Sequence, residues 1–192
     1  RVFFGSDDGT ARAVEAASGR LTWQFRPPAP RQTVIHDGRI ISPWPCRTGV
    51  AVVGGTAFCG MSMLPWKPTY LSALDAESGE PVAAGVRRFE EGYTLEAALL
   101  AAEGRVIAPQ GRAGVSIFDA ATLEPVGAVS GASSFATITP DDVFISGPFS
   151  RDIGLRGTSL QNPSAQAWHA QATACVADGD DVFMLSAGGV SG

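Results

Sequence analysis

Lysine is almost absent from this sequence, and no block of basic residues takes its place. Lys67 is the only lysine among the 192 residues, the other basic residues are scattered arginines, and the formal net charge is −5. A surface that binds a nucleic-acid duplex needs clustered lysine and arginine side chains to displace counterions. We therefore expect no nucleic-acid partner.

Long apolar runs and dense charge are also missing. No apolar run approaches the roughly 18 residues of a membrane-spanning helix, so we expect no membrane span. Charged residues make up only 17% of the chain and hydrophobic residues 45%, which argues against disorder, because disorder requires the opposite balance. With 23 glycines, 13 prolines and little helical periodicity, the composition predicts a β-rich domain with many turns.

Metal-binding patterns are lacking as well. Cys46, Cys59 and Cys175 form no C-x-x-C pair, and neither His36, in a predicted turn, nor His169, at a predicted strand end, lies at ligand spacing. We interpret the cysteines as small buried hydrophobic residues. A disulfide between Cys46 and Cys59 is the alternative in an oxidising compartment.

What the sequence does contain is a repeat. A short apolar strand recurs at intervals of roughly 37 to 55 residues, close to the period of four-stranded propeller blades. Its copies are Val2-Phe3, Ala57-Phe58, Val106-Ile107, Val143-Phe144 and Val182-Phe183. The next strand and turn of the unit carry related sequences at residues 13–19, 73–79 and 117–123.

The repeat predicts an all-β fold. Four strands joined by short turns form an antiparallel meander, which buries both of its faces only by stacking against neighbouring units. We predict a β-propeller of four-stranded antiparallel blades, a partial ring of about four to five blades, with a β-sandwich as the alternative. The approximate blades are residues 1–25, 49–85, 95–129, 134–169 and 172–192. The first holds the last three strands of a blade, so we expect the chain to be a fragment of a larger ring.

Residues 13–19 followed by Trp23 resemble the repeat of quinoprotein-type propellers, the PQQ-like repeat family. In that family a tryptophan of the last strand docks between adjacent blades, and Trp23 and Trp168 match its position. Ala83 and Gly127 occupy it in the second and third units, and Leu123 replaces the turn glycine of the third. The resemblance therefore implies an incomplete docking belt.

A narrower resemblance covers residues 1–82, where residues 2–9, 25–31 and 38–49 look like planctomycete PQQ-binding-like propeller proteins. Ala108-Pro109-Gln110-Gly111 fits the same group. This resemblance implies a periplasmic or secreted protein of the cell envelope.

The family's alcohol dehydrogenases use PQQ with calcium, held beside an adjacent pair of cysteines, with glutamate and asparagine as calcium ligands. This chain has no adjacent cysteines, and its only asparagine is Asn162, in a predicted turn. We therefore expect no cofactor and no catalytic or metal residues in this stretch, and we predict a non-catalytic scaffold. The alternatives are a fragment of a PQQ-dependent oxidoreductase and a recruiting propeller within a larger enzyme.

Propellers bind partners through the loops that rigid blades present. Two segments exceed hairpin-turn length: residues 26–48, with four arginines (Arg26, Arg31, Arg39 and Arg47) and Trp44, and residues 60–68, with Met63 and Trp66. Gln110 and Arg112 follow a predicted strand end. We expect these loops to bind a protein, peptide or glycan. The alternative is that Trp44 and Trp66 pack internally at the blade edges.

Overall fold

The computed structural model describes residues 1–102, 104–111, 113–130, 133–139, 143–147, 154–163, 165–179, 181–186 and 189–191. These residues form β-strands and no helix, so they include none that could cross a membrane. The strands make five antiparallel meanders, which we number as sheets one to five in chain order, and one additional hairpin.

The strands of sheet one are β1 (Val2–Ser6), β2 (Thr10–Val14) and β3 (Leu21–Phe25), and the hairpin is β4 (Val34–His36) with β5 (Arg39–Ile41). Sheet two contains β6 (Ala51–Val53), β7 (Thr56–Met61), β8 (Thr69–Asp75) and β9 (Pro81–Phe89). Sheet three contains β10 (Leu100–Ala102), β11 (Arg105–Pro109), β12 (Val115–Asp119) and β13 (Pro125–Val129). Sheet four contains β14 (Ala136–Ile138), β15 (Val143–Ser146), β16 (Leu155–Ser159) and β17 (Gln166–Ala170). Sheet five contains β18 (Ala174–Asp178), β19 (Asp181–Ser186) and β20 (Gly189–Ser191).

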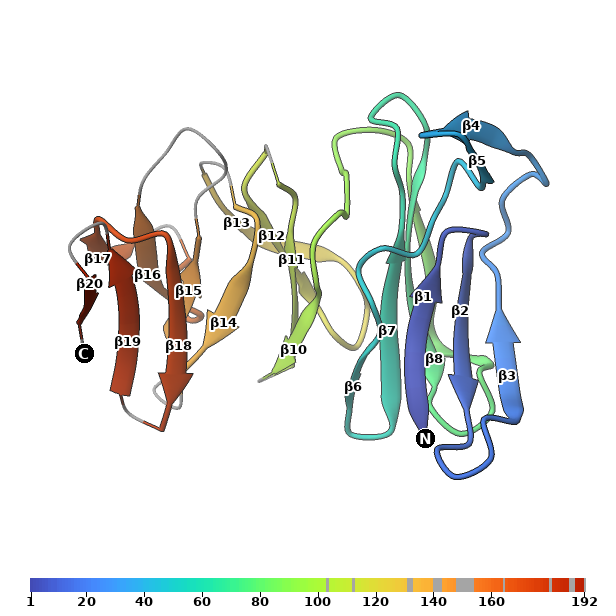
Figure 1. Ribbon diagram of the computed structural model, residues 1–192, viewed down its shortest axis with the longest axis horizontal. Helices are drawn as coiled ribbons and strands as arrows, with labels where there is room; N and C mark the ends of the chain where they lie inside the picture. The colour runs from blue at the N-terminus through green and yellow to red at the C-terminus, as the bar shows by residue number, and fades with distance from the viewer. Residues whose placement is uncertain are drawn as a thin grey trace.

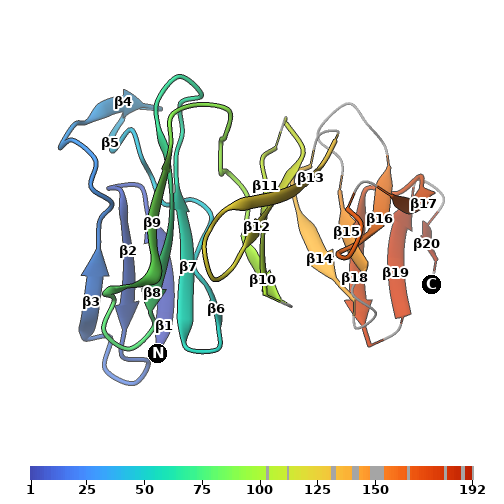
Figure 2. The same ribbon diagram turned by 180° about the vertical axis from the view of Figure 1, so that it is seen from behind.

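The five sheets stand side by side in chain order, from sheet one at the right of Figure 1 to sheet five at its left. The view from behind in Figure 2 shows the same succession. Within each sheet, strands adjacent in sequence pair antiparallel. This arrangement confirms the predicted all-β propeller class.

The hydrophobic core lies between successive sheets. Strand β7 illustrates the reason, because its residues alternate between two neighbours: Ala57 and Cys59 pack toward sheet one, whereas Phe58 packs toward sheet three. Two further clusters fill the boundaries between sheets three and four and between sheets four and five in the same way. Described residues on both faces of sheets two, three and four therefore pack against a neighbouring sheet, as stacked blades require.

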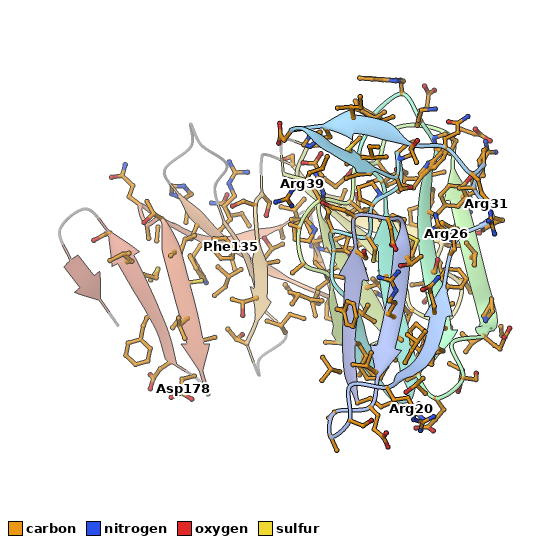
Figure 3. All side chains as sticks on the ribbon, turned by 45° about the vertical axis from the view of Figure 1, so that its right-hand side comes forward. Arg20, Arg26, Arg31, Arg39, Phe135 and Asp178 are labelled. Carbon is orange, nitrogen blue, oxygen red and sulfur yellow. The ribbon has the colours of Figure 1, made fainter. Side chains whose placement is uncertain are left out.

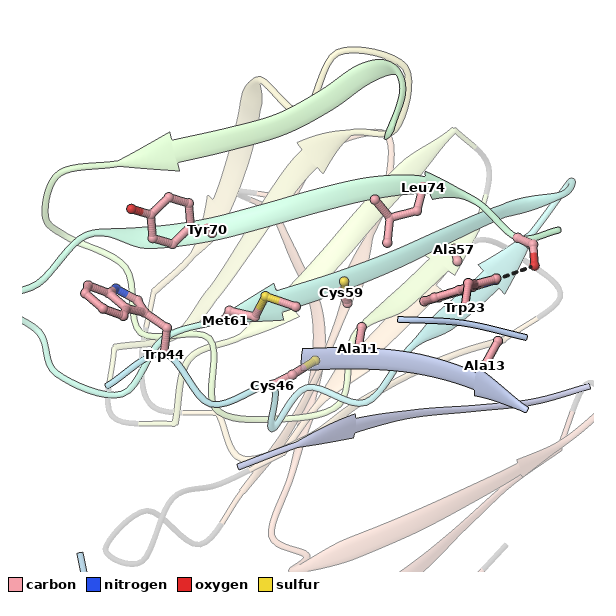
Figure 4. Close-up of a cluster of buried hydrophobic side chains, with 11 residues drawn as sticks. Ala11, Ala13, Trp23, Trp44, Cys46, Ala57, Cys59, Met61, Tyr70 and Leu74 are labelled. Atoms are coloured by element: carbon pink, nitrogen blue, oxygen red, sulfur yellow. Dashed lines mark hydrogen bonds between the residues drawn. The ribbon is translucent and has the colours of Figure 1, made fainter. Parts of the chain in front are cut away.

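Trp23 fills the boundary between sheets one and two. It is buried, and its Nε1 donates a hydrogen bond to the backbone oxygen of Ala76 at 3.1 Å (Figure 4). Gly79 supplies the space, because a Cβ added there would lie 2.6 Å from Trp23 Cδ2. A large side chain on one sheet thus fits against a missing side chain on the next.

At the boundary between sheets two and three, a leucine stands at the turn position that Gly79 occupies in sheet two. Leu123 takes the place of the turn glycine and adopts its left-handed backbone, with φ 57° against 76° at Gly79. In both turns, the amide of this residue donates to the carbonyl oxygen of the aspartate four positions earlier at 2.8 Å. The Leu123 side chain is fully buried in the cluster against which Val82 packs. Its buried side chain offsets the backbone strain that a non-glycine residue meets at positive φ.

Gly127 in sheet three and Trp168 in sheet four occupy the position that corresponds to Trp23 in sheet one. In all three sheets, the pairing register of the third and fourth strands of the unit shifts next to this position. Trp23 pairs with Ala13, Gly127 with Ile117, and Trp168 with Gly157. Each of these pairs combines a small residue with a large one. A Cβ added at Gly157 would lie 2.2 Å from Trp168 Cε2, so the ring of Trp168 covers the glycine of its own sheet. At Gly127, the proline ring of Pro163 lies 3.3 Å from where a Cβ would be.

Three features of the strands depart from the sequence expectation. The last strand of the second unit, expected at residues 81–85, continues to Phe89 through Gly85 at φ 65°. The hairpin β4–β5 lies inside residues 26–48, a segment expected to be a loop. Strand β16 is the third strand of the unit expected at residues 134–169, but the sequence does not locate it, because residues 155–159 carry no copy of the repeated turn sequence.

Candidate functional site

The hairpin β4–β5 projects from the upper end of sheet one in Figure 1. Its two-residue turn is Asp37-Gly38, and both residues have positive φ, 48° and 72°, as the tight turns of hairpins require. Two backbone hydrogen bonds fasten the chain after β5 to sheet one: Ser42 N to Asp7 O at 2.8 Å and Cys46 N to Ser6 O at 3.0 Å. The hairpin therefore has a rigid base.

Trp44 lies inside this base and is buried rather than available for binding. Its Nε1 donates to the backbone oxygen of Pro68 at 2.8 Å, and its ring meets Tyr70 edge-on with centroids 6.2 Å apart. The Lys67 ammonium stands 5.3 Å from the ring centroid of Trp44, within the range of a cation–π interaction. Trp44 thus joins the hairpin segment to the loop that precedes β8.

Trp66, in contrast, is 74% exposed on that same loop, between Pro65 and Lys67. Met63, at the start of the loop, is half-buried. The Lys67 ammonium also donates to Gln32 Oε1 at 3.3 Å, which links the loop to the chain before β4. The structure therefore brings the two long segments of the sequence together into one surface.

Arg47 belongs to the base of this surface. Its guanidinium pairs with the carboxylate of Asp7, with Nε 2.9 Å from Oδ1. This hydrogen bond, with the charges of Arg47 and Arg39, lowers the pKa of Asp7 below its ordinary value. Arg47 is therefore held in a structural ion pair.

Three arginines of the same segment behave differently. Arg26, Arg31 and Arg39 form no hydrogen bond or ion pair with any residue of the part of the chain that the structure describes. The other described arginines all have such partners, seven of them carboxylates. Figure 3 shows the three unpaired arginines toward the upper end of sheet one, whereas Arg20 lies at its lower end.

A cavity of about 450 Å³ opens between sheet one and the hairpin, and we call it the arginine pocket. Its lining residues are Asp8, Gln24, Arg26, Arg31, Gln32, Thr33, Ile40, Ile41 and Ser42. A second cavity, of about 380 Å³, lies on the side of the hairpin that carries Arg39 and His36. Both volumes fall within the range of ligand pockets, roughly 300 to 1,000 Å³.

The outer face of the hairpin is apolar. Ile35 and Ile40 are cross-strand partners, so their side chains share one face, and they are 83% and 76% exposed. Sequence reasoning missed both residues. The signal was present in Asp37-Gly38, flanked by Val34-Ile35 and Ile40-Ile41, because such a dipeptide between apolar runs predicts a hairpin.

Gln110 lies away from this surface and inside the third sheet. It is buried, its Nε2 donates to Ser116 Oγ at 2.6 Å, and its Oε1 accepts from the amide of Thr94 at 3.0 Å. These contacts make Gln110 a structural residue of the turn after β11. Arg112, the other candidate of this turn, lies outside the described residues.

Cys46 and Cys59 are free thiols that pack against each other between sheets one and two (Figure 4). The hydrogen bond between the two thiols lowers the pKa of Cys46, and the same bond together with complete burial raises the pKa of Cys59. The structure does not join them in the disulfide that was the sequence alternative.

The acidic side chains of the described residues are dispersed. These residues contain no group of three histidine, cysteine, aspartate or glutamate side chains close enough to share a metal ion. The acidic pair Asp7-Asp8 is engaged by Arg47 and Arg12. A calcium ion takes six to eight oxygen ligands. The exposed Asn162 belongs to a different turn from Asp7 and Asp8.

Neither a family model nor a curated protein matches the sequence. Among solved structures, BamB from Moraxella catarrhalis aligns with a TM-score of 0.67 at 14% identity, over 96% of this chain and 51% of BamB. The computationally designed Ika8 protein aligns with a TM-score of 0.65 at 13% identity, over 98% of this chain and 53% of the design. A europium-containing methanol dehydrogenase aligns with a TM-score of 0.63 at 12% identity, over 95% of this chain and 42% of the enzyme.

The chain spans about half the length of BamB and of the designed protein. Identities this low carry the fold and not the activity. The comparisons agree with the stacked antiparallel sheets in giving the chain a β-propeller fold.

Proposed function

We propose that this chain is part of a non-catalytic PQQ-like propeller that binds a protein partner in the cell envelope, through the surface formed by the hairpin and the Trp66 loop. The observation that carries this proposal is the exposure of Trp66, 74%, on a loop whose neighbours Trp44 and Lys67 are held in place. Tryptophan on a rigid support is typical of binding hot spots.

The sequence resemblance supports the envelope location and the planctomycete-type subgroup as parts of the same proposal. A non-catalytic role is supported by the engagement of Asp7 and Asp8 with arginines, because these carboxylates are then unavailable as cation ligands. A protein partner is favoured because the surface formed by the hairpin and the Trp66 loop exposes apolar side chains, Trp66, Ile35 and Ile40, as well as arginines.

The test uses the immobilised chain and an envelope extract of the organism that encodes it. Trp66→Ala should reduce capture of the partner about thirtyfold, the effect of removing a hot-spot residue worth about 2 kcal/mol. Its urea midpoint should stay unchanged, because an exposed side chain contributes little to folding. Val126→Ala is the matched control, since Val126 is 49% exposed on β13, outside the loop surface.

Two outcomes would contradict the proposal. Capture that survives Trp66→Ala, combined with a loss of stability, would mean that Trp66 serves packing. Saturable binding of PQQ with calcium, measured by tryptophan fluorescence and coupled to dye-linked alcohol oxidation by the complete protein, would favour the oxidoreductase alternative instead.

A further inference from the structure

We propose that the arginine pocket binds an acidic segment of the partner protein, with carboxylates on Arg26 and Arg31 and an adjoining apolar side chain against Ile40 and Ile35. This inference rests on the proposed function, that the loop surface binds a protein, and adds the chemical class of the bound segment.

The floor of the pocket is fixed before any ligand arrives. Ile41 and Ser42 are buried, and the amide of Ser42 donates to Asp7 O. Gly9 comes so close that a Cβ added there would lie 2.6 Å from Ser42 Oγ. On the far wall, Gln32 is held by the ammonium of Lys67. A site on such supports loses little conformational entropy when it binds.

The charge of the pocket is uncompensated. Its one acidic lining residue, Asp8, is already paired with Arg12 and accepts hydrogen bonds from Thr10 N at 3.1 Å and Thr10 Oγ1 at 2.5 Å. Burial alone would raise the pKa of Asp8, but hydrogen bonds from Thr10, Ser6 and Arg12 outweigh it and lower that pKa, so the carboxylate stays ionised within its pair. Arg26 and Arg31 therefore face the cavity without a described counterion.

This excess of positive charge is local, because the whole chain carries a formal charge of −5. The three described arginines without a partner all fall within residues 26–39. A ligand of negative charge is therefore attracted to this place on the described surface. Guanidinium groups bind carboxylates through paired N–H donors, a geometry that the Lys67 ammonium does not offer.

The apolar contacts distinguish a peptide from a simple anion. Ile40 lines the pocket, and Ile35 lies directly across from it on the outer face of the hairpin. A phosphate ion or an anionic polysaccharide would leave both isoleucines in water. A polypeptide that carries acidic and apolar side chains covers the arginines and the isoleucines together, so an acidic, leucine-containing segment is the favoured occupant.

The test measures binding of fluorescently labelled synthetic peptides to the 192-residue chain by anisotropy. The probe is a short peptide of glutamate and leucine, compared with one in which glutamine replaces glutamate and one in which serine replaces leucine. The glutamate–leucine peptide should bind most tightly, and raising sodium chloride from about 0.05 to about 0.5 M should weaken it.

Substitutions assign the binding to the pocket. The double variant Arg26→Gln/Arg31→Gln should weaken binding about tenfold, and Ile40→Ser should weaken it for the glutamate–leucine peptide but not for the serine peptide. Arg20→Gln is the matched control: Arg20 is also exposed, but it lies in the turn between β2 and β3 at the opposite end of sheet one and is paired with Glu15, so its loss should change nothing.

Equal affinity for the chain and the double variant would overturn the inference. Equal affinity for the leucine and serine peptides, or full competition by inorganic phosphate or polygalacturonate, would also overturn it, because either result would mean recognition of charge alone. The proposed function has a separate readout. If Trp66→Ala abolishes capture while the double variant does not, the scaffold role stands and only the acidic-segment inference falls.

Discussion

The contact between Trp23 and Gly79 gives the sharpest test of how neighbouring sheets are joined. Gly79→Ala adds a methyl group 2.6 Å from Trp23 Cδ2 and 2.7 Å from its Cγ, at a residue whose φ is 76°. Two costs follow: about 1 kcal/mol for placing an L-residue in the left-handed region, and about 1–3 kcal/mol for overpacking.

Gly19 separates these two costs. It occupies the equivalent turn of sheet one with φ 69°, but nothing lies within 4 Å of the Cβ that alanine would add. Gly19→Ala should therefore lose only about 1 kcal/mol of unfolding free energy. Gly79→Ala should lose about 2–4 kcal/mol, and the difference measures the collision with the indole ring.

A double-mutant cycle completes the test. Trp23→Ala should cost about 3–5 kcal/mol, because it removes a buried ring and the hydrogen bond to Ala76 O. In that background Gly79→Ala should cost only about 1 kcal/mol, since the methyl group then enters the vacated space. Urea unfolding followed by far-ultraviolet circular dichroism measures all four proteins. Equal losses for Gly19→Ala and Gly79→Ala, or additive losses in the cycle, would refute the docking of Trp23 on Gly79.

Three further predictions concern other parts of the chain. Leu123→Gly should lower the unfolding free energy by about 2 kcal/mol or more, since the lost buried side chain outweighs the relieved backbone, and a stabilised variant in urea would contradict this. The amide of Ser78 bonds to Asp75 and the hydroxyl of Thr122 bonds to Asp119, and these bonds lower both pKa values. Their contribution to stability should therefore be present above the unfolded pKa and be lost as the pH falls below about 4; an Asp75→Asn/Asp119→Asn variant that keeps the full acid sensitivity would disprove it. A thiol reagent should label the half-buried Cys175 first and reach Cys46 and Cys59 only on unfolding, so equal labelling rates in the native protein would show that the buried pair is accessible.

The sequence predicted the propeller class because its turn chemistry is local. The Asp-x-x-Ser-Gly and Asp-x-x-Thr-Leu turns place an aspartate whose Oδ1 accepts hydrogen bonds from the next turn residues, as found at Asp75 and Asp119. Such motifs depend on residues three positions apart in the chain, so they can be recognised without knowing which sheets pack against them. Strand β16 lacks the motif, and it forms through pairing with β15 and β17, which no local pattern reveals.

The candidate site was only partly accessible to sequence reasoning, for a different physical reason. Trp44 and Trp66 look alike in sequence, each next to a proline, but exposure depends on what the fold brings against them. Tyr70 and the Pro68 carbonyl contact Trp44, which is buried, whereas Trp66 is 74% exposed. The sequence shows where the arginines are. Whether Arg26 and Arg31 have partners among the described residues depends on which carboxylates the fold brings close to them.

The alternation along β7 has a consequence for how this fold tolerates change. Because Ala57 and Cys59 meet one neighbouring sheet and Phe58 meets the other, the parity of a residue number decides which interface it serves. Deleting one residue from β7 would exchange the two sets, pressing the phenylalanine ring into a space sized for alanine and leaving alanine where the ring belongs. In a sheet that packs against a neighbour on one face only, such a register shift would disrupt one interface. In β7, a one-residue shift would disrupt two interfaces, so insertions and deletions should be confined to the loops. The hairpin β4–β5 lies in such a loop, the connection between β3 and β6.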